Sequence, residues 1–301
     1  LIMSSAKVRK AVFAGSWYPS RASECEREIN GFLTEGKRLN PPDRSLVGGI
    51  VPHAGWYFSG SIACNVIHCL KGQDTTDVVV IFGMHLHADS PSYMMAEGAW
   101  ETPFGEIPIE ETLASEISQQ FSLKLETPKR FTQDNTVELQ LPFIKYFFKD
   151  AKIVAIGVPP HKKSLEIGRA VVEISKRLGL RVKVIGSTDL THYGANYGFV
   201  SKGSGKQAVD WVRNENDRRV IDAMLALEPE NVIAEGLSHQ NACCAGAAAA
   251  ALGAGLAAGA AAGRRVGRER RRRVADHEDV DRRIRAVVET RDVGLDVGRG
   301  G

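Results

Sequence analysis

The sequence predicts a single α/β domain, in which a central, mostly parallel or mixed sheet is flanked by helices. Four short apolar runs rich in β-branched residues alternate with longer segments whose apolar residues recur every three or four positions. Short continuous runs of this kind are typical of strands that are buried on both faces of a sheet. The three- and four-residue spacing is typical of helices that bury one face. The alternation of the two patterns favours a layered α/β architecture.

The expected elements follow one another along most of the chain. Strands are expected at residues 46–51, 77–82, 151–158 and 181–186. Helices are expected at residues 59–70, 113–121, 136–148, 164–178 and 206–227. Residues 100–109 combine an alternating pattern with Pro and Gly, which predicts a hairpin or an excursion at the sheet edge.

The composition is that of a globular protein rather than a collagen-like, disordered or disulfide-stapled one. Of the 301 residues, 43% are apolar and 25% are charged, and five are cysteines. A small, odd number of cysteines favours a reducing compartment, so we expect a cytoplasmic protein. The chain lacks an uninterrupted apolar run of about 18 residues, so we expect no membrane span. Its first residues do not resemble a secretory leader, so we expect no export.

A change of composition divides the chain near Leu252. From Leu252 onward there are 12 Arg and 8 Asp or Glu residues, and the last aromatic residue of the chain is Trp211. One interpretation is a basic arm for nucleic acid, but interspersed acidic residues and the lack of aromatic rings for base stacking argue against it. The other is a low-complexity extension, or a sequence translated out of frame. We assign residues 1–251 to the α/β domain and residues 252–301 to an atypical Ala/Gly/Arg-rich tail, which we expect to be poorly ordered or poorly packed.

Three of the four expected strands are followed by a histidine. His53 and His85 follow the first and second strands, and His192 follows the fourth. One histidine after a strand is usually an ordinary loop residue. However, ligands of open α/β sheets bind beyond the carboxyl ends of the strands, where parallel neighbours would bring the three imidazoles together. The pattern therefore predicts a metal-binding or catalytic site, although imidazole suits Fe, Zn, Cu and Ni alike.

Other reactive side chains near these positions each have two interpretations. Asp189 could orient an imidazole or ligate beside His192, or it could cap the turn after the strand. Cys243 and Cys244 could supply a soft ligand or a redox-active thiol, or they could be small core residues. Glu138 could hydrogen-bond a ligand or favour a helix N-terminus.

Six short motifs give the sequence a resemblance to a known family. They lie at residues 14–19 (AGSWYP), 51–60 (VPHAGWYFSG), 100–105 (WETPFG), 137–143 (VELQLPF), 187–194 (STDLTHYG) and 241–244 (NACC). In order and spacing these motifs resemble the Memo family, known in prokaryotes as AmmeMemoRadiSam system protein B, over roughly residues 8–250. That family is similar in fold to the class III extradiol dioxygenases, which use non-haem Fe(II).

The resemblance implies a site formed by three histidines and a cysteine, with iron or copper as the metal. These residues carry over onto His53, His85, His192 and, by the Asn-x-x-Cys spacing, Cys244. In this interpretation Asp189 positions a ligand.

The sequence departs from the family pattern in three places. Many relatives have a His at the position of Leu86, whereas this chain has His85 and His87 on either side of it; we assign His85, as in a Gly-Gly-His-Leu subgroup. Asn135 stands where many relatives have a His, which argues against a proton-transfer role at that position. Relatives end with a helix and a Tyr- and Gly-containing strand. An Ala/Gly/Arg-rich segment replaces these here, and if the last sheet strand is absent, we expect the edge of a neighbouring strand to be bare and apolar.

Three functions are consistent with these observations. The first is redox or oxygen-dependent chemistry on a small aromatic or similar molecule, although dioxygenases usually use two histidines and a carboxylate. The second is a non-catalytic module that binds a peptide or partner protein in the same cleft, with Trp17, Trp56 and Tyr57 either as anchors or as core residues. The third is an accessory subunit that works with radical SAM and AMMECR-type proteins.

Overall fold

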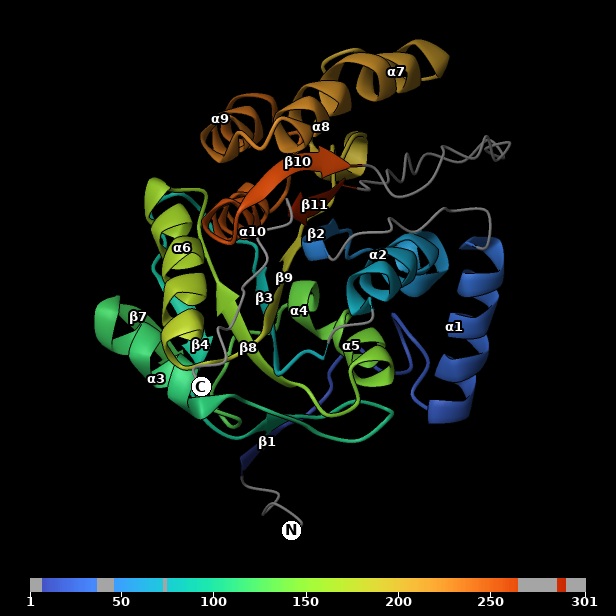
Figure 1. Cartoon of the computed structure of the whole chain (residues 1–301). Helices are drawn as coiled ribbons and strands as arrows, with labels where there is room; N and C mark the ends of the chain where they lie inside the picture. Colours follow the sequence, from blue (N-terminus) through green and yellow to red (C-terminus); the bar gives the residue numbers. More distant parts are fainter. Residues whose placement is uncertain (1–6, 37–45, 73–74, 265–285, 291–301) are drawn as a thin grey trace.

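The computed structural model describes residues 7–36, 46–72, 75–264 and 286–290, and it contains two sheets in these ranges (Figure 1). The smaller sheet consists of β1 (Val8–Arg9), β5 (Ala99–Trp100) and β6 (Ile107–Pro108). The larger sheet consists of β2 (Leu46–Val51), β3 (Val78–Gly83), β4 (Ser92–Met95), β7 (Leu123–Glu126), β8 (Lys152–Gly157), β9 (Val182–Ser187), β10 (Ala260–Arg264) and β11 (Ala286–Thr290). Its strands are ordered β10-β11-β2-β9-β3-β8-β4-β7.

The centre of the larger sheet confirms the predicted fold class and strands. The four runs expected as strands form β2, β9, β3 and β8, which are parallel neighbours. Every side chain of β3 is buried, as expected for a strand covered on both faces. The predicted hairpin is also present, because β5 and β6 pair antiparallel. Strands β4 and β7 continue the sheet beyond β8 and were not predicted from the sequence.

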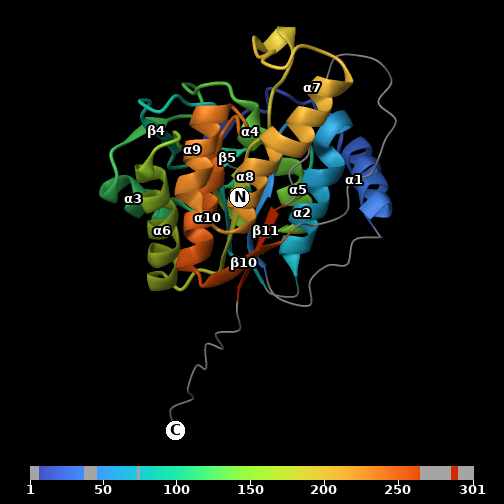
Figure 2. The ribbon, with the colours of Figure 1, turned by 90° about the horizontal axis from the view of Figure 1, so that it is seen from above.

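Helices cover both faces of the larger sheet. They are α1 (Ala22–Gly36), α2 (Ser61–Lys71), α3 (Glu111–Gln120), α4 (Asn135–Glu138), α5 (Leu141–Phe147), α6 (Lys162–Arg177), α7 (Lys206–Trp211), α8 (Asp217–Leu225), α9 (Pro229–His239) and α10 (Ala245–Ala257). Helices α6, α9 and α10 lie on one side of the sheet, and α1, α2 and α5 lie on the other (Figures 1 and 2).

Two of the predicted helices are interrupted. The helix expected at residues 136–148 is divided into α4 and α5, and Pro142 lies in the first turn of α5. A proline lacks the N–H that would continue a helix and its ring clashes with the preceding turn, so the helix restarts there. The helix expected at residues 206–227 is divided by a π-helical turn at Val212–Asn216.

The Ala/Gly-rich segment is a closely packed helix rather than the start of a loose tail. Helix α10 lies against α6 and β9, and the side chain of Leu252 is completely buried. A Cβ atom on Gly168 of α6 would lie 2.1 Å from the carbonyl oxygen of Ala250, so only small residues allow this approach. The prediction that the chain packs poorly after Leu252 is therefore wrong for Gly253, Ala254 and Gly255, which are buried.

The prediction of a bare strand edge is also wrong. β11 pairs antiparallel with β2, and β10 pairs antiparallel with β11, so the edge of β2 is covered. Residues 265–285 and 291–301, on which the rest of the predicted tail falls, lie outside the described residues. The division of the chain at Leu252 stays a prediction. Within the described ranges, every helix is too short or too polar to traverse a lipid bilayer.

Candidate metal centre

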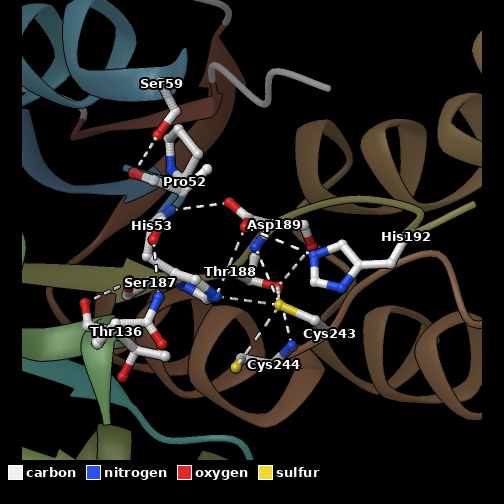
Figure 3. A network of polar contacts seen from close by, with 12 residues as sticks. Pro52, His53, Ser59, Thr136, Ser187, Thr188, Asp189, His192, Cys243 and Cys244 are labelled. Atoms are coloured by element: carbon white, nitrogen blue, oxygen red, sulfur yellow. Dashed lines mark hydrogen bonds and ion pairs between the residues drawn. The ribbon is translucent and has the colours of Figure 1, made fainter. Parts of the chain in front are cut away.

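Three neighbouring strands deliver polar side chains to one point at the edge of the larger sheet. His53 lies two residues beyond the end of β2, His85 two residues beyond β3, and Asp189 two residues beyond β9. Because these strands are adjacent and parallel, their carboxyl ends meet at the same edge. Cys243 reaches this point from the loop before α10 (Figure 3).

The loop that carries the two cysteines is fixed to the end of β9. The backbone N–H of Cys243 donates to the carbonyl of Asp189, at 3.1 Å, and the N–H of Cys244 donates to Thr188 Oγ1, at 3.0 Å. The N–H of Asp189 donates in return to Cys243 Sγ, at 3.2 Å. These bonds hold the Cys243 sulfur against the strand ends although it lies far away along the chain.

Two imidazoles and a thiol converge at the centre of the site. His53 Nε2 lies 3.2 Å from His85 Nε2 and 3.2 Å from Cys243 Sγ. The sulfur of Cys244 lies 3.7 Å from that of Cys243. The ligand atoms of His53, His85, Cys243 and Cys244 all lie within 4.8 Å of one another, so this group could hold a metal ion.

His192 belongs to a second group that shares Cys243. Its Nε2 lies 3.5 Å from Asp189 Oδ2, and these two residues form a compact group with Cys243. Asp189 also joins the two groups, because its Oδ1 accepts a hydrogen bond from the backbone N–H of His53, at 2.8 Å. The structure therefore brings all three predicted histidines to one cleft, but it places His192 beside Asp189 rather than with the other two.

The outward-facing nitrogen of each central imidazole has its own partner. His85 Nδ1 lies 2.9 Å from Asp134 Oδ2. His53 Nδ1 lies 3.0 Å from Ser187 Oγ. Each Nε2 atom is therefore free of these partners and faces the Cys243 sulfur. A nitrogen that binds a metal beside this sulfur would point in the same direction.

The charges around the sulfur favour a thiolate at Cys243. Burial raises the pKa of Cys243, but the hydrogen bond with Cys244, the charge of His53 and the hydrogen bonds with His53 and His85 outweigh it and hold that pKa well below its ordinary value. Burial and the neighbouring thiolate raise the pKa of Cys244 well above its ordinary value, so the shared proton stays on Cys244. Burial lowers the pKa of His85, but its bonds to Asp134 and Cys243 outweigh burial and raise that pKa to about 10.

The site opens into a cleft of about 430 Å³. The cleft is lined by His53, His85, Asn135, Asp189, His192 and a rim that includes Trp17, Tyr57, Phe58 and Tyr197. Tyr57 is 86% exposed and Trp17 is 41% exposed, so aromatic surface faces solvent at the rim. Trp56 is different, because it is buried and stacks on Phe143 with ring centroids 4.1 Å apart.

The structure adds detail to the assignment of the site cysteine and of the second histidine. The resemblance assigned the site cysteine to Cys244, which does belong to the group that could hold a metal, but Cys243 makes the contact with His53, and Cys244 is 3% exposed behind it. The Asn-x-x-Cys spacing favoured the second of two adjacent cysteines, and only the fold distinguishes them. Exposed His87 belongs to neither ligand group found among the described residues.

Glu138 has a structural contact that neither of its interpretations foresaw. Its Oε1 accepts hydrogen bonds from the backbone N–H groups of Val12 and Phe13, at 2.8 and 2.7 Å, and from the hydroxyl of Tyr18, at 2.9 Å. The carboxylate thus holds the N-terminal segment that carries Trp17 to the cleft.

The residues that orient the two imidazoles were missed in the sequence. Asp134 and Ser187 contact His85 and His53, but neither side chain has a spacing to a histidine that marks this role. The signal for Asp134 is its position as the N-cap of α4, which predicts a helix start and no more.

The fold and the site define an α/β protein with a His/Cys group, able to hold a metal, at the carboxyl edge of parallel strands. A family model described as "Memo-like protein" matches residues 9–277. The chain therefore belongs to the Memo-like protein family, as the motifs predicted.

Two MEMO1 family proteins agree with this assignment, and one solved structure aligns more loosely. A MEMO1 family protein of Pyrococcus furiosus is 34% identical over 235 residues, which cover 76% of this chain and 80% of the relative. A MEMO1 family protein of Pyrobaculum aerophilum is 35% identical over 195 residues, which cover 62% and 69%. A crystal structure of an uncharacterized protein from Escherichia coli K12 aligns with a TM-score of 0.45 and 12% identity, over 69% of this chain and 88% of that one.

Proposed function

We propose that the protein binds one transition metal ion, iron or copper, through His53, His85 and Cys243, and that the metal serves redox or oxygen-dependent chemistry on a small molecule in the cleft. The observation that carries the proposal is the convergence of two imidazole Nε2 atoms and one sulfur. Each of the two contacts to His53 Nε2 measures 3.2 Å. Both imidazoles present this nitrogen because Nδ1 already has a partner.

The spacing of these donor atoms suits a metal ion. Metal–nitrogen bonds of about 2.0–2.1 Å and metal–sulfur bonds of about 2.3 Å place tetrahedral ligand atoms roughly 3.4–3.6 Å apart. The observed separations are within a few tenths of an ångström of these values. The donor atoms would need to move apart by only a few tenths of an ångström, so the residues present fit the ion.

The donor set favours a soft or borderline metal. Two imidazoles and a thiolate suit copper, zinc or iron, whereas oxygen-dependent non-haem iron sites usually have two histidines and a carboxylate. Asp189 is the carboxylate nearest the centre, yet its Oδ2 lies 3.8 Å from His53 Nε2 and it is not grouped with His85. We therefore assign the anionic ligand to Cys243 and leave Asp189 beside His192.

When bound, the metal would supply Lewis-acid and electron-transfer chemistry at the floor of the cleft. The chain's own residues supply the rest. His192, whose side chain is 39% exposed, can hold or move a proton at Nε2 beside Asp189. The aromatic rim offers flat faces to a planar molecule, and the His192 ring already lies 4.9 Å from the ring of Tyr197.

The same rim favours a second candidate function, the binding of a peptide or partner protein without catalysis. Aromatic side chains are common anchors at such surfaces, and Trp17, Tyr57 and Phe58 expose theirs at the cleft mouth. A partnership with radical SAM and AMMECR-type proteins rests on the resemblance alone and stays a prediction.

Metal analysis of the protein purified without added metal tests the proposal. We expect close to one iron or copper ion per chain, lost in His53→Ala and Cys243→Ala. The matched variant Cys69→Ala should retain the metal, because Cys69 belongs to neither ligand group found among the described residues. A protein that neither contains metal nor takes up Fe(II), Cu(I) or Zn(II) on reconstitution contradicts the proposal and favours the binding module.

A further inference from the structure

A single carboxylate fixes the segment that carries His85. Asp134 Oδ2 lies 2.9 Å from His85 Nδ1 and also accepts the backbone N–H of His85, at 3.1 Å. Its other oxygen accepts the N–H of Thr136, at 2.9 Å, and the Thr136 hydroxyl. Asp134 therefore caps α4 and holds the imidazole at the same time. Because an ionised carboxylate can only accept, Nδ1 of His85 must carry a proton.

The same segment fixes His53 through Ser187. The Ser187 hydroxyl donates to the carbonyl of Thr136, at 2.7 Å. A hydroxyl has one proton, so Ser187 Oγ must accept at its second contact, from Nδ1–H of His53 at 3.0 Å. In addition, Asn135 Nδ2 donates to the carbonyl of His53, at 2.8 Å. The backbone and the ring of His53 are thus both tied to the opening of α4.

The turn before His85 also depends on this segment. Met84 has a φ of +71°, which is costly for a residue with a side chain. Its N–H donates to Thr136 Oγ1, at 2.7 Å, and this bond holds the turn in place. This bond fixes the backbone that leads directly into His85.

From these contacts we infer that Asp134, Asn135 and Thr136 form one positioning element that turns the Nε2 atoms of both His53 and His85 toward Cys243. The inference on ring orientation stands on hydrogen bonds alone, whereas its consequence for metal affinity rests on the proposed function. Partners of this kind fix the protonated nitrogen and the orientation of ligand imidazoles, and their loss costs about 10–100-fold in metal affinity.

Two substitutions of Asp134 separate positioning from helix capping. Ser and Asn both cap helices well, so Asp134→Ser and Asp134→Asn should both keep α4. Neither variant leaves an acceptor for Nδ1–H of His85, because Ser is too short and Asn uses its one oxygen for the cap, so that its NH2 group, a donor, faces the ring. We expect the Nδ1–H signal of His85 in the NMR spectrum of histidine-labelled, metal-free protein to be lost in both variants, with His85→Gln assigning the signal.

Zinc affinity, measured by competition with a chelating dye, is the second readout. We expect Asp134→Ser and Asp134→Asn each to bind zinc about 10–100-fold more weakly than the wild type. Ser187→Ala should remove the Nδ1–H signal of His53 and leave that of His85 in place, since each ring has its own partner.

The inference is overturned if Asp134→Ser leaves the His85 signal unchanged, or if it perturbs both rings equally, because equal loss indicates general loosening of the fold. Thermal unfolding of each variant distinguishes this case. A wild-type protein that takes up no zinc would contradict the proposed function instead, and the NMR signals would still decide the positioning role.

Discussion

The two adjacent cysteines show how different neighbouring side chains can become at the residue scale. Cys243 contacts His53 and the backbone N–H of Asp189, whereas Cys244 is buried and contacts Cys243. The pKa of Cys243 is lowered well below its ordinary value, and the pKa of Cys244 is raised well above it. One residue is therefore poised as a metal ligand or nucleophile and the other as a hydrogen-bond donor to it.

This difference predicts how the thiolate titrates in metal-free protein. A lowered pKa means that Cys243 is deprotonated at neutral pH, and that it gains a proton only as the pH falls well below the ordinary value of about 8.5. Ultraviolet absorbance of the thiolate should therefore be present at neutral pH in the wild type and absent in Cys243→Ala. In Cys244→Ala the thiolate loses a donor, so its titration should move to higher pH. A wild-type titration at the ordinary thiol pKa would contradict the assignment.

Among the helices, α10 combines an unusual Ala/Gly-rich composition with very close packing on its neighbours. Its alanines and glycines carry little helical amphipathicity, yet they allow close contact with both α6 and β9. Gly168 faces Ala250 and Gly186 faces Ala247, with no room for a Cβ atom at either position. The composition predicted that a tail begins within this segment. The segment is instead part of the core beneath the candidate site.

The close approach of α6 and α10 predicts the effect of one added methyl group. In Gly168→Ala, the new Cβ would lie 2.1 Å from the Ala250 carbonyl oxygen, so the helices must separate. We expect the free energy of unfolding to fall by about 3 kcal/mol or more, as overpacking does. Gly31→Ala in α1, which has no neighbouring atom within 4 Å, is the matched control and should raise it by about 1 kcal/mol. Urea unfolding measures both, and equal effects would contradict the packing argument.

On the scale of the whole molecule, the candidate site joins parts of the chain that are far apart in sequence. His53 and His85 follow different strands, and the Cys243 sulfur that meets His53 is 190 residues further along the chain. An ion held by these residues would link both sheet strands to the loop before α10. Such an ion stabilises the folded state because the unfolded chain cannot assemble the ligands.

Metal removal should therefore lower the stability of the entire domain. With free zinc at about 100 times its dissociation constant, we expect the free energy of unfolding to rise by about 2.7 kcal/mol over the value in a chelator. Cys243→Ala should lose this difference, whereas Cys69→Ala, outside the site, should keep it. Urea unfolding with and without the metal provides the measurement. An equal gain in Cys243→Ala would place the ion elsewhere.

The sequence by itself determined those features that depend on local patterns. Continuous β-branched runs predicted β2, β3, β8 and β9, and the six motifs predicted the family. Histidines after parallel strands predicted a shared cleft, because strand direction alone sends these residues to one edge. Each of these signals lies within a few neighbouring residues.

Only the tertiary structure decided which atoms meet within that cleft. It placed Cys243 rather than Cys244 against His53, and it gave both imidazoles their partners through Asp134 and Ser187. It also turned an Ala/Gly-rich segment into a buried helix and covered the edge of β2 with β11. The physical reason is that each outcome depends on distances between residues that are remote in sequence, where a shift of an ångström changes the contact and no local pattern records it.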